Sequence, residues 1–239
     1  PMCAAQAFAS SLEESGAVSR VGRIRVVLYG SLSLTGLGHG TDRAILAGLE
    51  GNVPATVDTD YLLSVRERCA HNGTIHVNGT NAIAYDDDGD MVFDRWKRLA
   101  PHPNGMRFQA FDAQGNIIDE QVWYSIGGGF IRRGRIDDAL ISNHEQTPAS
   151  SQSPEDSGND EAAEYGDGVP YPFVSCDGLI DLCRKHHLSI ADVVWANETA
   201  RRSPQEVRDR LTRIWNVMSH CIDAGCASAT PTLPGGLDV

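Results

Sequence analysis

One histidine of this chain lies in a loop whose composition suits proton transfer. His39 stands between Gly38 and Gly40 within residues 29–42, YGSLSLTGLGHGTD, and Thr41 follows directly. Glycines let a backbone turn sharply and approach a ligand closely. An imidazole with the ordinary histidine pKa, about 6.5, can accept or donate a proton near neutral pH. On local features alone, a strand-to-helix turn that carries a solvated histidine is the more frequent explanation of this pattern.

The segments on either side predict how this loop is positioned. Residues 23–29 are rich in β-branched side chains and predict a strand. Residues 42–48 open a predicted helix that ends near residues 51–52. Thr41 or Asp42 could cap this helix, because a side-chain oxygen there satisfies orphan N–H groups. We therefore expect the loop between a strand and a helix.

A triple glycine is the second candidate site. It follows an antiparallel hairpin predicted from strands at residues 106–111 and 117–124. Three glycines contribute no side chains to packing, so they mark a tight turn or a close backbone approach to an anion. A plain turn is the commoner outcome, and the anion alternative stays open. The candidate substrate-binding residues are Gly38, Gly40, Gly127, Gly128 and Gly129.

The rest of the N-terminal part mixes helices and strands, which predicts an α+β fold. Helices are predicted at residues 2–15 and 60–69, and a hairpin at residues 73–84 around Asn78-Gly79. Residues 86–90, DDDGD, lack the ligand spacing of a calcium loop and predict an exposed acidic turn.

A polar segment divides the chain. Residues 149–168 are rich in Ser, Gly, Asp and Glu and predict a flexible linker. The predicted domains are residues 1–148, α+β, and residues 169–239, a partial all-α region.

Three helices are predicted after the linker, at residues 178–187, 189–201 and 204–221. Ser189 and Ser203 are expected to be the N-caps of the second and third. The third helix carries an apolar stripe of a kind more typical of a core face than of a cofactor site. The stripe consists of Leu211, Ile214, Trp215 and Met218.

Composition restricts the possible partners. The 239 residues carry a formal net charge of −12, which disfavours nucleic-acid binding. No run approaches 18 apolar residues, so no membrane span is predicted, and no signal peptide is visible. The six cysteines contain no C-x-x-C pair, so we interpret them as structural thiols of a reducing cytoplasm, with no metal site. They are Cys3, Cys69, Cys176, Cys183, Cys221 and Cys226.

Several collinear segments resemble one family. Residues 29–42 are similar to the glycine-histidine loop of bacterial iron–sulfur L-serine dehydratases, also called L-serine ammonia-lyases. Further segments resemble that family in the same order, with the weakest likeness at residues 59–103 and near residue 150. These segments are GNVPATVD at 51–58, NGMRFQAF at 104–111, QVWYSIGGGFI at 121–131, VPYPF at 169–173, WNVMSHCIDAG at 215–225 and LPGGL at 233–237.

The resemblance implies the front half of a longer enzyme that converts L-serine to pyruvate and ammonia. Its first region would be a β domain similar to the allosteric substrate-binding domains of some phosphoglycerate dehydrogenases. A helical domain would carry a 4Fe-4S cluster, one iron of which acts as Lewis acid, and no pyridoxal phosphate is involved. None of the six cysteines matches the family's cluster ligands, so the resemblance implies that the ligands lie outside this chain.

The resemblance also assigns roles. His39 would be a catalytic acid/base and Thr41 its polar partner. The implied partners are L-serine, the C-terminal catalytic domain of the same protein and a second copy in a homodimer, with no nucleic acid or membrane. The alternatives are a non-catalytic serine-binding regulatory module or β subunit, and a structural protein. The helices predicted after residue 168 argue against a β subunit that ends near the linker.

Overall fold

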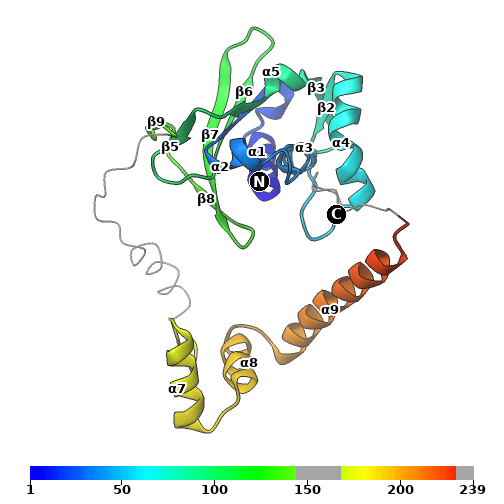
Figure 1. Ribbon diagram of the computed structural model, residues 1–239. Coiled ribbons are helices and arrows are strands. Elements are labelled where there is room, and N and C mark those ends of the chain that lie inside the picture. The colour runs from blue at the N-terminus through cyan, green and yellow to red at the C-terminus, as the bar shows by residue number, and fades with distance from the viewer. Residues whose placement is uncertain (144–167, 230–239) are drawn as a thin grey trace. The chain divides into compact units, whose positions relative to one another are not determined.

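A mixed seven-stranded sheet organises the first part of the chain (Figure 1). The computed structural model describes residues 1–143 and 168–229. It divides into two units, Pro1–Thr147 and Pro148–Val239. The first combines helices with strands, and the described part of the second is helical, which confirms the α+β class. The predicted linker, residues 149–168, lies outside the described residues except for its last one, so the domain limits stay a prediction.

The first unit follows the predicted order closely. Its elements are α1 (Met2–Glu14), η1 (Val18–Arg20), β1 (Arg23–Tyr29), α2 (Ser31–Thr35), α3 (Thr41–Leu49), α4 (Thr59–Asn72), β2 (Thr74–Val77), β3 (Asn81–Ala84), α5 (Asp87–Asp90), β4 (Met91–Asp94), β5 (Lys97–Leu99), β6 (Gly105–Phe111), β7 (Ile117–Gly127), β8 (Phe130–Arg133) and β9 (Leu140–Ser142). The strand at residues 23–29, the helices at 2–15 and 60–69 and both hairpins are confirmed.

The strand order is β2-β3-β1-β6-β7-β8, and β4 also pairs with β1. β1 runs antiparallel to β6 and parallel to β4. β3 and β4 share one edge of β1: Ala84 pairs with Arg23 at its start, and β4 pairs from Val26 onwards. The segment from β3 through α5 to β4 therefore acts as one interrupted strand beside β1.

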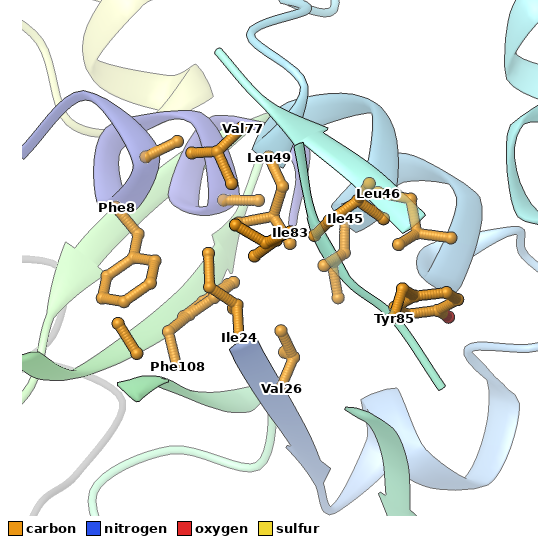
Figure 2. Close-up of a cluster of buried hydrophobic side chains, with 14 of the residues drawn as sticks. Phe8, Ile24, Val26, Ile45, Leu46, Leu49, Val77, Ile83, Tyr85 and Phe108 are labelled. Atoms are coloured by element: carbon orange, nitrogen blue, oxygen red, sulfur yellow. The ribbon is translucent and has the colours of Figure 1, made fainter. Parts of the chain in front are cut away.

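One face of the sheet is covered by α1, α3 and α4. Side chains alternate along a strand, so Ile24, Val26 and Leu28 of β1 all point into this layer and are buried. Figure 2 shows Phe8 and Phe108 against each other in the cluster, with ring centroids 5.3 Å apart. Each such buried side chain contributes about 1.5–3 kcal/mol to folding.

The crossing of α1 and α3 depends on a glycine. A Cβ atom at Gly48 would lie 2.3 Å from the carbonyl oxygen of Met2 and 2.8 Å from the Cβ of Ala5. Both distances are shorter than any ordinary van der Waals contact. α3 can therefore lie this close to α1 only because residue 48 has no side chain.

We expect Gly48→Ala to lower the free energy of unfolding by about 1–3 kcal/mol, the usual cost of overpacking a core. Urea unfolding followed by circular dichroism measures this change. The control is Gly225→Ala in α9 (Pro204–Ala227), where an added Cβ meets nothing within 4 Å. It should be neutral or stabilise by up to about 1 kcal/mol. A Gly48→Ala protein as stable as the parent would contradict the close-crossing argument.

The other face of the sheet carries a smaller apolar cluster. Leu99 of β5, which pairs with β9, belongs to it. Tyr124 donates a hydrogen bond to Asp138 at 2.6 Å. Burial and this bond raise the pKa of Tyr124, so its phenol stays protonated. The cluster consists of Val27, Tyr29, Leu99, Val122 and Tyr124.

The acidic segment at residues 86–90 differs from its prediction. It forms the short helix α5, and its last residue, Asp90, is 2% exposed and paired with Arg23. Asp87 accepts hydrogen bonds from Arg66 and Tyr85. The expected exposed turn is therefore wrong for these two carboxylates, because arginines from β1 and α4 reach them.

The described part of the second unit contains α7 (Cys176–His186), α8 (Ile190–Arg201) and α9 (Pro204–Ala227). The side chains of Ser189 and Ser203 cap α8 and α9 as predicted. The predicted core stripe on α9 is instead exposed, because the described residues include nothing that covers it. The exposed fractions are 56% for Leu211, 56% for Ile214, 61% for Trp215 and 52% for Met218.

None of the helices in residues 1–143 and 168–229 is both long and apolar enough to span a membrane.

Candidate functional site

The glycine loop connects β1 to α3, as the sequence predicts, with one addition. A five-residue helix, α2, follows β1 at once, and a turn over residues 36–40 leads into α3. The backbone N–H of Ser31 donates to the carbonyl of Pro103 at 2.9 Å, which attaches the start of α2 to the segment before β6. The sequence predicts a loop throughout this stretch, so α2 is a difference from that prediction.

The turn presents the imidazole and buries the hydroxyl. His39 is exposed, and it forms no hydrogen bond through its side chain within the described part of the chain. Thr41 is 5% exposed. Its N–H donates to the carbonyl of Gly36 at 2.8 Å, and the His39 N–H is shared between the carbonyls of Thr35 and Gly36. The backbone of the turn is thus closed on itself beneath an outward imidazole.

Two of the glycines are required by this geometry. A Cβ at Gly36 would lie 2.0 Å from the carbonyl oxygen of Leu32. Gly40 has φ of 65°, in the left-handed region that other residues adopt at a cost. Gly38 has open space around it, since the nearest atom to an added Cβ is 3.6 Å away. Packing therefore does not require a glycine at position 38.

The expected cap of α3 is wrong. The N-cap residue is Gly40, and it makes no side-chain hydrogen bond. Thr41 and Asp42 are instead the first two helical residues, and both are buried. Asp42 nevertheless places a negative charge in the first turn, where the helix dipole stabilises it.

The register of the sheet places several loops at the end where β1 terminates. Leu28 pairs with Met106, and Met106 pairs with Trp123, so the three form one row. β1 ends one residue past this row at Tyr29, and β7 continues in the same direction to Gly127. We call this end of the sheet the glycine-loop edge. It comprises residues 30–41, 94–97, 101–104 and 127–129.

The triple glycine forms the turn between β7 and β8 at this edge. Gly127, Gly128 and Gly129 are exposed and have φ of 101°, 58° and 86°. Three consecutive left-handed residues explain why this turn contains only glycine. Both candidate glycine segments thus leave the same end of the sheet, and a role in substrate binding stays a prediction.

A second histidine at the glycine-loop edge was missed from the sequence. His102 lies between two prolines, and its Nδ1 accepts the N–H of Asn104 at 3.1 Å. This bond favours the tautomer with the proton on Nε2. Partial burial and the nearby Arg132 lower the pKa of His102. The signal available in the sequence was a histidine inside a Pro-x-Pro-Asn turn directly before a predicted strand.

Asp42 is anchored from α4 at the start of α3. Its Oδ2 accepts a hydrogen bond from Nη1 of Arg66 at 2.5 Å. The same guanidinium binds both oxygens of Asp87, and this interaction and the Asp42 pair raise the pKa of Arg66. Asp87 has a lowered pKa for the same reason.

Glu50 is anchored from α4 at the other end of α3. It pairs with Arg68, accepts a hydrogen bond from Tyr61 and takes the N–H of His76 at 3.0 Å. Burial alone would raise the pKa of Glu50, but these hydrogen bonds outweigh it and lower the pKa. Burial and the Glu50 carboxylate together raise the pKa of Tyr61 to about 12.

A pH dependence of stability follows from Glu50. Its folded pKa is lowered, so its contribution is complete above the unfolded value of about 4.3 and is lost as pH falls through the folded pKa. We expect Glu50→Gln to reduce the free energy of unfolding by about 1–3 kcal/mol at pH 7. Urea titrations of both proteins at several pH values should show this difference shrinking below about pH 4.3. A difference that stays constant down to the acid limit would contradict the assignment.

The described residues do not fit an iron–sulfur cluster. Within residues 1–143 and 168–229, no three His, Cys, Asp or Glu side chains group closely enough to hold a metal ion. Cluster ligands are thiolates. Burial, together with nearby Glu50, raises the pKa of the Cys69 thiol to about 11, which keeps it protonated. We therefore derive no catalytic step through a cluster from the described residues.

The fold and the loop define an α+β domain that presents an imidazole beyond the end of a central strand. Residues 1–135 match the family described as the serine dehydratase beta chain, so the chain belongs to that family.

Curated relatives extend over the whole chain. It is 38% identical to an L-serine dehydratase of Streptomyces coelicolor, 35% to L-serine dehydratase 1 of Escherichia coli and 34% to an L-serine dehydratase of Mycobacterium tuberculosis. Each match covers 100% of this chain and 47–48% of the relative. The chain therefore spans about half the length of these relatives.

Proposed function

We propose that this chain is the front part of an iron–sulfur L-serine dehydratase, which converts L-serine to pyruvate and ammonia. The observation that carries the proposal is the exposed imidazole of His39 at the glycine-loop edge of a domain that belongs to the serine dehydratase beta chain family. The relatives named L-serine dehydratase support the substrate.

His39 acts as acid/base in this proposal. The net reaction requires removal of the α-proton of serine and departure of its hydroxyl group as water, after which aminoacrylate hydrolyses to pyruvate and ammonia. An exposed imidazole on a closed turn can take or supply one of these protons. Thr41 lies two residues away and is proposed as its polar partner. The backbone at Gly38, Gly40 and the triple glycine is proposed to contact substrate.

The helical unit favours an enzyme over a regulatory module. The exposed apolar face of α9 requires a packing partner, because so large a surface is costly in water. The relatives are about twice as long as this chain. We propose that further helices of the same polypeptide cover this face, that the cluster ligands lie among them, and that the enzyme is a cytoplasmic homodimer.

Replacing the histidine tests the proposed role. In the longer enzyme, we expect His39→Ala to lower kcat for L-serine about 10²–10⁴-fold, the usual range for a general acid/base. Iron content and melting temperature should match the parent, since His39 neither packs in the core nor is expected to bind iron. Thr41→Ala should lower kcat less, because Thr41 is proposed as a polar partner and does not itself transfer the proton.

His71→Ala is the matched control for this experiment. His71 is exposed near the end of α4. The next strand, β2, begins with Thr74, which lies in the same row of the sheet as Arg23. This row is at the end of the sheet opposite the glycine-loop edge. It should leave kcat unchanged. A stable, iron-replete His39→Ala enzyme with nearly normal kcat would remove His39 from the mechanism.

The location of the cluster can be tested on the 239-residue chain itself. After anaerobic reconstitution with iron and sulfide, we expect no cluster absorbance and no pyruvate from L-serine, because the described cysteines do not converge. Stoichiometric iron and sulfide, or measurable turnover, would show that this chain supplies ligands after all.

A further inference from the structure

The His39 turn is held between α2 and α3, and within the described residues no side-chain hydrogen bond supports it. Its backbone hydrogen bonds are local, between residues of α2, the turn and the start of α3. Gly40 joins the turn to α3 in a left-handed conformation without a side-chain cap. The direction in which His39 points therefore depends on the orientation of the first turn of α3 as well as on α2.

That first turn is fixed by one guanidinium. Arg66 of α4 contacts Asp42 of α3 through Nη1 at 2.5 Å. It contacts Asp87 of α5 through Nε at 3.0 Å and through Nη2 at 2.8 Å. The planar fork of arginine can serve two carboxylates in this way, whereas a lysine ammonium is a point charge. Three separate elements meet at this side chain.

The Asp42 carboxylate relies on Arg66 heavily. Its side chain is 2% exposed, and its Oδ1 has no hydrogen-bond partner among the described residues. A buried carboxylate without a counter-charge is strongly unfavourable. Without Arg66, the first turn of α3 would have to open and expose Asp42 to water, and the adjoining residues 36–41 would move with it.

We propose that Arg66 is a positioning residue for His39, acting through Asp42. The proposal that Arg66 fixes the direction of His39 rests only on contacts within this chain. Its catalytic consequence rests on the proposed function. Asp42 follows His39 by three residues, so a shift of the helix start by about 1 Å would displace the imidazole by a similar distance, and displacements of that size can cost about 10²-fold in rate.

The chain supplies a matched control two residues further along α4. Arg68 pairs with Glu50, which is buried to a similar degree and lies at the opposite end of α3. The side chains of Arg66 and Arg68 are 27% and 33% exposed. Arg68→Gln therefore removes a buried ion pair of α3 without touching the end that adjoins His39, whereas Arg66→Gln also removes the pair with Asp87.

The first experiment measures amide hydrogen exchange by NMR on the 239-residue chain. We expect Arg66→Gln to accelerate exchange at His39, Gly40 and Thr41 by about tenfold or more, as local opening does. Asp42→Asn should do the same by breaking the pair from the other side. Arg66→Lys should give an intermediate effect. Arg68→Gln should leave these three amides unchanged.

The second experiment measures kinetics in the longer enzyme. Arg66→Gln should lower kcat about 10–100-fold while KM changes by less than a few-fold, since a displaced acid/base weakens the transition state selectively. Arg66→Lys should recover part of kcat. Arg68→Gln should lower the melting temperature without changing kcat.

The outcomes separate the two proposals. Unchanged amide exchange in Arg66→Gln, or equal acceleration in Arg68→Gln, would overturn the positioning role. If Arg66→Gln does not fold, the exchange rates of Asp42→Asn decide whether the ion pair fixes the turn. Normal kcat in Arg66→Gln beside a large loss in His39→Ala would also overturn it. Normal kcat in His39→Ala would instead overturn the proposed role of His39, and the exchange result alone would then decide whether Arg66 fixes the turn.

Discussion

The burial of α3 between α1 and the sheet is the constraint on which the first unit depends. Ile45, Leu46 and Leu49 are at most 1% exposed, and Gly48 allows α1 to approach without a clash. A helix buried on two sides cannot shift without opening the core. The core therefore fixes the body of α3, and Arg66 holds its first turn, which adjoins the exposed turn that carries His39.

Local chemistry made much of the fold predictable. The strand at residues 23–29, the hairpin around Asn78-Gly79 and the caps of α8 and α9 depend on β-branched side chains, left-handed turn residues and serine oxygens. Each of these effects acts within a few residues. The position of His39 between strand and helix follows from the same signals.

The missed features are those that depend on distant residues. The sequence predicts Asp42 as a helix cap, but Asp42 forms a buried ion pair with Arg66, which is 24 residues away. Asp90 reads as part of an exposed turn, but Arg23, 67 residues away, pairs with it. Nothing in the local sequence of either acid reveals the partner. The prediction that the apolar stripe of α9 lies in a core was wrong for a different reason. Such a stripe shows only that a helix needs a packing partner, and the described residues do not include one.

The glycine-loop edge combines a rigid base with an open surface. Leu34 and Leu37 flank the histidine turn and are 58% and 54% exposed. Trp96 at the same edge is 73% exposed, and Phe130, which directly follows the triple glycine, is 61% exposed. An acid/base that acts on an amino acid works best where water is excluded. Apolar side chains around an exposed imidazole would provide that exclusion once another surface packs on them. An exposed apolar surface of this kind is compatible with the proposal that another part of the longer enzyme packs on this edge.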